Sequence, residues 1–342
     1  MKVKLLFSLA FILFFISSNI YSCSELAQVQ WHQEDPSPND SFYNIVMTEL
    51  KKHEPTLEEK NVKFTKGGLS ADLVAIGKNT VVRLSTSKYN PLENTKVIGL
   101  YQKFIIDEIC VHTIGFKLCL PEFIILYTNA LNAAPDKKTF SLQVMPKALG
   151  NPLNFYLVES NPDCVLGQIF SELGKATAIF QNRFMTRIGD QYFTAAHTDF
   201  HGGNIFCQAI PKKNKMITEY SFSLIDCSEL ELRGIHPVMD IAYLLYHSCY
   251  CLYATKRPSD SLQYVTENFY RGYLSHLPQQ VSSYLIQLLP EARRISTCEL
   301  IKTKNLMFLD ERNPSIKGFI PYFDHIHRDA VKRTIESLMA PS

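Results

Sequence analysis

The chain has 342 residues, of which 46% are hydrophobic and 20% are charged, and its formal net charge at pH 7 is +2. This composition excludes a disordered chain and a strongly basic protein of the kind that binds nucleic acid. The length is sufficient for two subdomains with a sizeable core.

The first 22 residues have the three parts of a secretory signal peptide. A basic start at Met1–Lys4 precedes an apolar run from Leu5 to Ile16, and a short polar stretch ends at Ser22. We predict cleavage after Ser22 and a mature protein that is secreted or periplasmic, with delivery into a host cell as one destination. The apolar run is short for a membrane span of about 20 residues, and an uncleaved signal anchor is the alternative.

Nine cysteines are compatible with export and with disulfides, but require neither. No pair has the spacing of zinc ligands, and Cys249 and Cys251 are too close in sequence for a relaxed bridge. Cys110, Cys207 and Cys227 lie in apolar runs, where a free cysteine is usually a small core residue. The sequence leaves the presence of a disulfide open.

Residues 23–60 form a polar, acidic-leaning leader segment, and short strands follow it. Residues 61–146 are expected to form a small N-terminal lobe of antiparallel sheet plus one helix. The helix is predicted from apolar residues that recur at helical spacing in residues 92–115. The strands are predicted from short apolar runs bounded by turn signals, at residues 62–64, 72–76, 80–85, 121–127 and 140–145.

The pattern becomes mainly helical after a turn-rich connector at residues 146–152. We therefore expect a helical C-terminal lobe over residues 147–342 and an α+β fold of two lobes. Its helices are predicted at residues 165–180, 237–252, 262–274 and 321–338.

A loop between these elements carries the pattern His197-x-Asp199-x-His201-x-x-Asn204, and Asp226 follows an apolar strand downstream. The segments between Asn204 and Asp226 predict a hairpin that brings these two residues to the same end of paired strands. Two carboxylates and a carboxamide are the groups that phosphoryl transfer from a nucleotide requires. One acid orients the attacking hydroxyl, while the amide oxygen and the other acid hold Mg2+ against the phosphates.

In the order of its elements and motifs, the chain resembles the protein-kinase-like fold. Within that fold it is similar to the small-molecule branch of aminoglycoside phosphotransferases and choline kinases. The resemblance covers residues 61–250 and is carried by His197-x-Asp199-x-His201-x-x-Asn204 together with Asp226. It implies ATP and Mg2+ as cofactors.

The resemblance implies a role for each residue of this loop. Asp199 would accept or orient the proton of the substrate hydroxyl. Asn204 and Asp226 would bind the metal ions. His197 would brace the loop through a hydrogen bond to the backbone, and His201 is either a residue that approaches the substrate or a structural loop histidine.

The resemblance assigns nucleotide contacts to the N-terminal lobe. The turn that contains Gly67, Gly68 and Ser70 would lie over the phosphates, and a tight hairpin without a ligand is the alternative. Arg83 would stand in place of the lysine that pairs with the phosphates. Its acidic partner would be Glu108, because a buried acid on an apolar helix stripe requires a cation, with Asp107 as the competitor.

Further residues complete the site that the resemblance implies. Met145 would lie at the hinge that reads the adenine edge, with Leu142 and Ile225 as further apolar residues facing the ring. Asp240 resembles the acid that anchors the catalytic loop from a helix start, and an ordinary first-turn aspartate is the alternative.

Two departures separate the chain from protein kinases. Cys227 and Ser228 follow Asp226 where protein kinases have Phe-Gly, and Asp240 comes only 14 positions after Asp226. This leaves little room for a long activation segment. A small-molecule substrate is therefore favoured over a protein.

We expect an ATP- and Mg2+-dependent phosphotransferase that acts on a hydroxyl of a small molecule or, less favoured, of a protein. Two alternatives stay open: a pseudokinase that only binds its ligand, and an enzyme that transfers AMP. We expect no nucleic-acid partner and no stable membrane span after signal cleavage.

Overall fold

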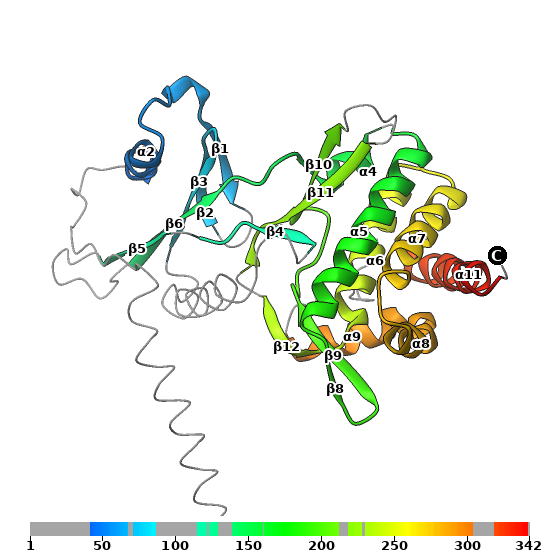
Figure 1. The fold of residues 1–342 in the computed structure, drawn as a ribbon. Helices are drawn as coiled ribbons and strands as arrows, with labels where there is room; N and C mark the ends of the chain where they lie inside the picture. The colour runs from blue at the N-terminus through cyan, green and yellow to red at the C-terminus, as the bar shows by residue number, and fades with distance from the viewer. Residues whose placement is uncertain are drawn as a thin grey trace, which may run out of the picture. The chain divides into compact units, whose positions relative to one another are not determined.

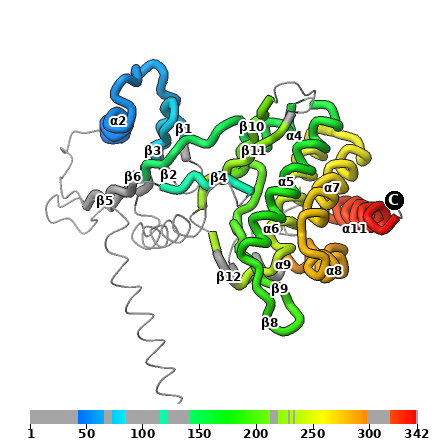
Figure 2. Tube along the Cα trace, viewed as in Figure 1, coloured from blue at the N-terminus to red at the C-terminus, as the bar shows by residue number. Residues whose placement is uncertain are grey.

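A computed structural model describes residues 42–67, 71–86, 115–121, 123–128, 139–159, 161–211, 218–227, 230–303 and 318–340 (Figure 1 and Figure 2). Several predictions lie outside these residues. They concern the signal peptide, the helix predicted at residues 92–115 except for Gly115, and the residues Gly68, Ser70 and Glu108.

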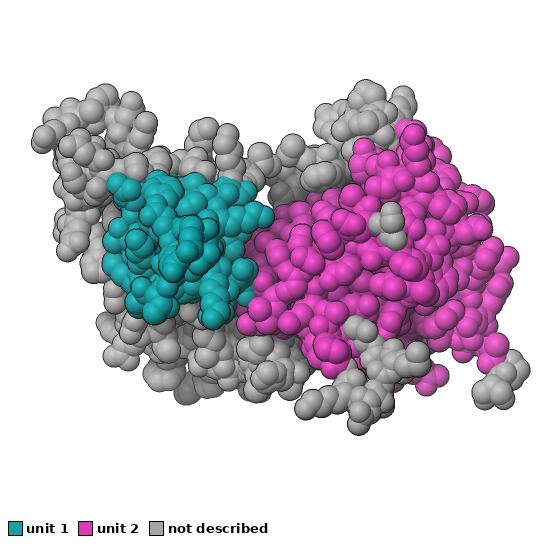
Figure 3. Space-filling view, turned by 90° about the horizontal axis from the view of Figure 1, so that it is seen from above, with its two compact units in different colours: residues 1–110, 119–147 teal, residues 111–118, 148–342 magenta. Residues whose placement is uncertain are grey.

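The chain divides into two compact units (Figure 3). The sheet unit falls within residues 1–110 and 119–147, and the helical unit within residues 111–118 and 148–342. The chain therefore passes between the units three times, because residues 111–118 interrupt the sheet unit.

The described core of the sheet unit is a five-stranded antiparallel sheet in the order β1-β2-β3-β6-β5. The five predicted strands are confirmed, with their ends shifted by up to three residues. Their bounds are β1 (Lys63–Gly67), β2 (Ala71–Ile76), β3 (Thr80–Thr86), β5 (Phe123–Thr128) and β6 (Thr139–Pro146).

The leader segment contains a helix that the sequence analysis missed. Helix α2 (Phe42–His53) buries Val46, Met47 and Leu50 against the sheet. The description of residues 23–60 as a polar leader is therefore corrected for this helix. The leader segment is polar on average, and this average concealed the apolar residues that recur at helical spacing in α2. The core that α2 completes also contains Ala75, Val82, Leu84, Leu142 and Val144.

Glu54 ties the end of α2 to the turn between β2 and β3. Its carboxylate accepts hydrogen bonds from the backbone N–H groups of Lys78, Asn79 and Thr80 at 2.8, 2.8 and 2.7 Å. Burial raises the pKa of this carboxyl, but the three N–H donors lower the pKa by more than burial raises it. The pKa of Glu54 therefore lies below its ordinary value. The contact stabilises the turn that leads into the strand carrying Arg83.

The helical unit contains the four predicted helices, which are confirmed with ends shifted by up to three residues, and further helices that the sequence analysis did not predict (Figure 1). The predicted ones are α5 (Asp163–Arg183), α6 (Val238–Ala254), α7 (Ser259–Leu274) and α11 (Phe319–Met339). The additional ones include α4 (Leu153–Val158), α8 (Gln279–Leu288) and α9 (Ala292–Thr303), with a short 3-10 turn η4 (Leu289–Glu291) between the last two.

Helices α5 and α7 approach each other through glycine. A Cβ atom at Gly174 would lie 2.1 Å from the carbonyl oxygen of Phe269, and one at Gly272 would lie 2.0 Å from that of Ser171. Both distances are far inside van der Waals contact. The backbones of the two helices therefore meet where any side chain would hold them apart.

Two small sheets of the helical unit carry the loop of interest. The predicted hairpin is confirmed as β10 and β11, which pair antiparallel from Ile205 opposite Leu224. β9 ends directly before His197, where the loop starts, and β10 begins directly after Asn204. The strand orders are β4-β11-β10-β7 and β12-β9-β8. Their bounds are β4 (Phe116–Leu118), β7 (Asn151–Pro152), β8 (Thr186–Ile188), β9 (Gln191–Ala196), β10 (Ile205–Pro211), β11 (Thr218–Leu224) and β12 (Glu231–Ile235).

Two observations concern membrane spans and thiols in the part of the chain that the structure describes. None of the described helices is long and apolar enough to cross a membrane. The cysteines whose side chains are described carry free thiols, namely Cys119, Cys164, Cys207, Cys227, Cys249 and Cys251.

Candidate active site

The loop at residues 197–204 folds back on itself so that Asp199 and Asn204 are in contact. The backbone N–H of His201 donates to the carbonyl oxygen of Asp199 at 3.0 Å, and that of Asn204 donates to His201 at 2.9 Å. The amide Nδ2 of Asn204 then donates to both the carbonyl oxygen and Oδ2 of Asp199, at 3.0 and 2.9 Å. A spacing of five residues thus becomes a direct carboxylate–carboxamide contact.

Three side-chain donors surround the carboxylate of Asp199. Besides Asn204, the Nε2 atom of His201 lies 3.5 Å from Oδ2, and the hydroxyl of Tyr243 on α6 donates to Oδ1 at 3.4 Å. Burial raises the pKa of Asp199, but hydrogen bonding and charge from His201 together with the Asn204 donor lower it below its ordinary value. The side chain is 32% exposed. It is therefore an ionised carboxylate that is accessible from solvent.

The hydrogen bonds of His201 define its tautomer. Its Nδ1 accepts the backbone N–H of Gly203 at 3.0 Å, so that the ring proton is on Nε2, the atom that faces Asp199. The ring packs beside His247 with a centroid separation of 5.1 Å. Burial, with a further contribution from His201, lowers the pKa of His247 to about 4 although Asp199 acts in the opposite direction, and the His247 ring is neutral at pH 7. His201 donates to Asp199 through Nε2. This contact is compatible with both predicted roles of His201, as a residue that approaches the substrate and as a structural histidine of the loop.

Asp240 anchors the start of the loop from the first turn of α6. It is buried, and its carboxylate accepts the backbone N–H groups of His197 and Thr198 at 2.6 and 3.1 Å. Thr198 has a φ of +62°, a conformation that is costly for a β-branched residue. The two hydrogen bonds to Asp240 hold the backbone in this conformation next to Asp199.

His197 braces the loop against the strand that precedes Asp226. It is fully buried, and its Nε2 donates to the carbonyl oxygen of Ile225 at 2.9 Å. Burial lowers the pKa of His197, while the hydrogen bond to Ile225 and the nearby charges of Asp199 and Asp226 act in the opposite direction. The ring is therefore neutral at pH 7, and it makes the backbone contact that the resemblance implies.

Asp226 lies at the base of the same hairpin as Asn204. The backbone N–H of Ile225 donates to the carbonyl oxygen of Asn204 at 3.0 Å, one residue beyond the last strand pair. Asp226 itself has a φ of +55°, in the left-handed region that favours glycine. The turn of the chain out of β11 is thus made by a carboxylate residue with strained backbone, as is common at functional sites.

The donor atoms of Asn204 and Asp226 fit a magnesium ion. Because Nδ2 of Asn204 is directed to Asp199, its Oδ1 is the remaining ligand atom of the amide. This oxygen and the carboxylate of Asp226 are the hard ligands that Mg2+ prefers, and nucleotide phosphates and water complete such a site. The described residues contain no cluster of three or more His, Cys, Asp and Glu side chains that could hold a metal ion by itself.

The predicted nucleotide contacts that the structure describes belong to the sheet unit. Arg83 is half-buried in β3 opposite Gln143 of β6, and Met145 is buried near the end of β6. Directly opposed residues share a face of a sheet, so Arg83 and Met145 lie on the face away from α2. Leu142 is on the other face, in the core with α2, and its predicted contact with an adenine ring is wrong.

The glycine turn is described only in part. Gly67 is the last residue of β1 and pairs with Ala71 after an irregularity in the register. Asp199, Asn204 and Asp226 belong to the helical unit, and the roles predicted for Gly67, Arg83 and Met145 stay predictions.

Tyr243 and His247 were missed in the sequence. Both lie on α6, one and two turns after Asp240, and this spacing places them on the helix face that meets the loop. The spacing was readable, but the contact with Asp199 depends on how α6 packs against the loop.

Asp240 gives the first testable prediction. Burial raises its pKa to about 7, with a further contribution from Asp199, although the N–H donors of His197 and Thr198 act in the opposite direction. Between about pH 4 and pH 7 the carboxyl of Asp240 stays protonated in the folded chain but is ionised in the unfolded chain. The stability from this group is therefore complete below about pH 4 and is lost as the pH rises to 7.

We expect the Asp240→Asn variant to lack this part of the pH dependence, because its amide does not titrate. The amount by which the unfolding free energy of the wild type exceeds that of the variant should shrink, or change sign, from pH 5 to pH 8. Urea denaturation at both pH values measures it. A difference that grows in favour of the wild type at higher pH would contradict the prediction.

Comparison with known proteins gives matches among solved structures only. No protein-family model and no curated protein sequence matches the chain. An amicoumacin kinase in complex with AMP-PNP, Ca2+ and Ami is 12% identical, with a TM-score of 0.44 over 82% of this chain and 93% of that one. The GDP complex of an aminoglycoside 2'-phosphotransferase is 10% identical, with a TM-score of 0.44 over 85% of this chain and 96% of that one. A streptomycin-ATP-APH(2")-IIa ternary complex is 11% identical, with a TM-score of 0.41 over 77% and 95%.

The fold class follows from the topology of the chain itself. A five-stranded antiparallel sheet precedes a mainly helical unit, and a loop and hairpin in that unit bring Asp199, Asn204 and Asp226 together. The predicted α+β class, with an antiparallel sheet unit before a mainly helical unit, is confirmed.

Proposed function

We propose that this protein is an ATP- and Mg2+-dependent phosphotransferase that acts on a hydroxyl group of a small molecule. The observation that carries the proposal is the contact between Asp199 and Asn204, in a loop anchored by Asp240 and joined to Asp226 by one hairpin. An ionised carboxylate, a carboxamide oxygen and a second carboxylate thus come from neighbouring backbone positions.

Each residue has a distinct task in this reaction. Asp199 accepts a hydrogen bond from the substrate hydroxyl and directs its oxygen toward the phosphorus, which suffices because the transition state is loose. Asn204 fixes the rotamer of Asp199 and, with Asp226, supplies the metal ligands. Bound Mg2+ would neutralise charge on the phosphates. Arg83, on its face of the sheet, would bind the phosphates through its guanidinium.

The segment after Asp226 favours a small substrate over a protein. Residues 231–235 form β12, which pairs with β9 at the entrance to the loop. Helix α6 then begins at Val238. The 14 positions from Asp226 to Asp240 are therefore occupied in large part by a strand and a helix start, which limits the length available for a protein-kinase activation segment.

A transfer assay tests the function. The purified chain is incubated with Mg2+, with ATP labelled at either the γ or the α phosphate, and with sugars, aminoglycosides and choline-like alcohols as acceptors. We expect label from the γ position on an acceptor, and no transfer by Asp199→Ala or Asp226→Ala. Transfer that survives both substitutions would refute the mechanism. Label from the α position would show AMP transfer, and ATP binding without transfer would show a pseudokinase.

Tyr243 should contribute a smaller effect through Asp199. Its hydroxyl donates to Oδ1 of that carboxylate at 3.4 Å, so we expect Tyr243→Phe to lower kcat about three- to tenfold with an unchanged KM for ATP. Steady-state kinetics measure both constants. Tyr253→Phe, on the same helix but 45% exposed, is the matched control. Equal effects of the two substitutions would contradict a role for Tyr243.

Export belongs to the proposal as well. We propose that residues 1–22 direct secretion and that the protein meets ATP in a eukaryotic secretory lumen or inside a host cell. N-terminal mass spectrometry of the protein from its native source tests the first part. A mature chain that starts at Cys23 is the expected result, and a chain that retains the first 22 residues would contradict cleavage.

A further inference from the structure

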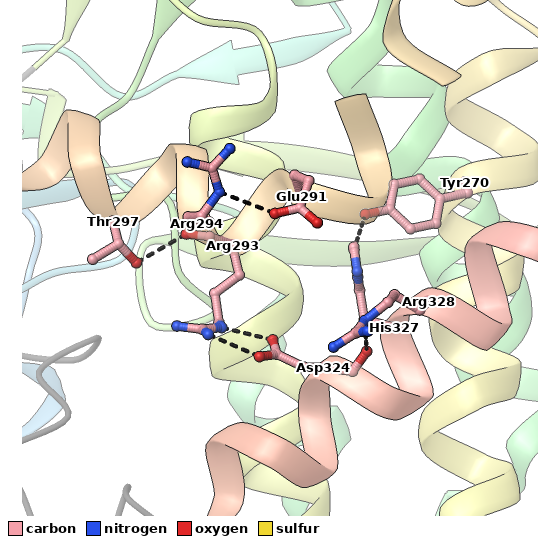
Figure 4. A network of polar contacts seen from close by, with 8 residues as sticks. All are labelled: Tyr270, Glu291, Arg293, Arg294, Thr297, Asp324, His327 and Arg328. Atoms are coloured by element: carbon pink, nitrogen blue, oxygen red, sulfur yellow. Dashed lines mark hydrogen bonds and ion pairs between the residues drawn. The ribbon is translucent and has the colours of Figure 1, made fainter. Parts of the chain in front are cut away.

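A pocket of about 300 Å3 lies in the helical unit, lined by residues of η4, of the start of α9 and of α11 (Figure 4). It is separate from the catalytic loop. Its charged lining consists of three arginines and two carboxylates, which sum to a charge of +1: Arg293, Arg294, Arg328, Glu291 and Asp324. None of the described residues that line it is aromatic.

One bidentate ion pair joins the two helices at this pocket. Arg293 Nε and Nη2 donate to the two carboxylate oxygens of Asp324 at 2.6 and 2.8 Å. The side chains are only 17% and 24% exposed, and a parallel two-point contact of this kind is strong and fixed in geometry. Arg293 and Asp324 thus neutralise each other and set the position of α11 against α9.

The other two arginines are anchored differently. Arg294 donates through Nε to Glu291 at 3.0 Å, and Arg328 donates through Nε to the backbone oxygen of Asp324 at 3.2 Å (Figure 4). These contacts orient each guanidinium group. The Nη1 and Nη2 atoms of both have no hydrogen-bond partner within the described part of the chain. Two guanidinium edges are therefore available at one pocket.

We infer that this pocket binds a phosphate group, either free or as the phosphomonoester of a small molecule. Two guanidinium edges offer four N–H directions, which suits a tetrahedral dianion, whereas a carboxylate is satisfied by one edge. The volume leaves room for a short substituent. A nucleotide base would lack an aromatic stacking partner among the described lining residues.

The positive charge of the pocket comes from arginine alone. The nearby His327 is buried and makes a hydrogen bond with the hydroxyl of Tyr270 (Figure 4). Burial, with the charges of Arg328 and Arg293, lowers its pKa to about 4, although Asp324 acts in the opposite direction. The ring is neutral at pH 7, and the arginines keep their charge throughout the neutral range.

Isothermal titration of the full chain with inorganic phosphate, glycerol 3-phosphate and acetate tests the inference. The titrations are made at constant ionic strength with saturating AMP-PNP and Mg2+, so that phosphate in the proposed nucleotide site is not counted. If AMP-PNP itself does not bind, the proposed function is in question and the phosphate titration is still read by itself. We expect saturable binding of at least one of the two phosphates at one site per chain, and none of acetate. Phosphate alone would identify the free ion, and tighter binding of glycerol 3-phosphate would identify the ester.

Substitutions at the two available arginines locate the site. We expect the double variant Arg294→Gln with Arg328→Gln to bind at least about tenfold more weakly, and the corresponding double lysine variant to fall between it and the wild type. Arg333→Gln, on α11 and 64% exposed, is the control and should bind as the wild type does. Unchanged melting temperatures exclude loss of the fold. Equal affinity in the glutamine variant, equal binding of acetate, or no saturable binding of either phosphate would overturn the inference.

Discussion

The Asp199→Asn variant should lose about 10²- to 10⁴-fold in kcat with little change in KM for ATP. Asparagine keeps the size of the side chain and one acceptor oxygen, but it lacks the negative charge that orients the substrate hydroxyl. In the proposed reaction the ligands of the metal and of the phosphates are Asn204, Asp226 and Arg83, and Asp199 is not among them, so that nucleotide affinity should persist. Steady-state kinetics with the acceptor found in the transfer assay measure the effect.

Asp190→Asn is the matched control for this experiment, because Asp190 is fully exposed in the turn between β8 and β9. It should keep wild-type kinetics. If Asp199→Asn retained more than about a tenth of the wild-type kcat, Asp199 would not be the orienting base. A large rise in KM for ATP would instead place Asp199 near the nucleotide.

Gly272→Ala should destabilise the helical unit by about 1–3 kcal/mol or more, as overpacking does in a core. The added Cβ would lie 2.0 Å from the backbone oxygen of Ser171, and this atom cannot move without displacing α5. This loss of stability exceeds the stabilisation of up to about 1 kcal/mol that alanine brings through its higher helix propensity. Urea denaturation gives the difference in unfolding free energy.

Gly318→Ala serves as the control, because a Cβ there meets no atom within 4 Å. It should change stability by less than about 1 kcal/mol. A Gly272→Ala variant as stable as the wild type would show that α5 and α7 can separate at little cost. The close backbone approach would then not be required for the fold.

The parts of the molecule that could be predicted have local signals. The spacing of Asp199 and Asn204, and two apolar strands around a polar tip, predicted the loop and the hairpin. The strands of the sheet unit were readable because turn residues separate them. Helix α2 was missed because its apolar residues, such as Val46 and Leu50, lie among polar residues. The segment was described by its average composition, which is polar, and not by the spacing of its apolar residues.

Other features have no local signal. Asp240 contacts the backbone of His197 from 43 positions downstream, and Tyr243 reaches Asp199 from 44 positions away. The face of β6 that carries Leu142 became clear only when α2 was known to cover it. Left-handed backbone at Thr198 and Asp226 could not be predicted either, because neither position is glycine and the surrounding contacts impose the conformation.

The strand β4 limits how this protein can be cut for study. Residues 116–118 pair in parallel with residues 222–224 of β11, directly before Ile225 and Asp226. A fragment that begins at residue 148 would contain every helix from α4 to α11 but would lack β4. Its β11 would present an open strand edge, which favours self-association, next to the carboxylate proposed to bind metal. An inactive helical fragment would thus report the loss of a three-residue strand together with the loss of the sheet unit, and a study of the helical unit by itself has to keep residues 111–118 attached.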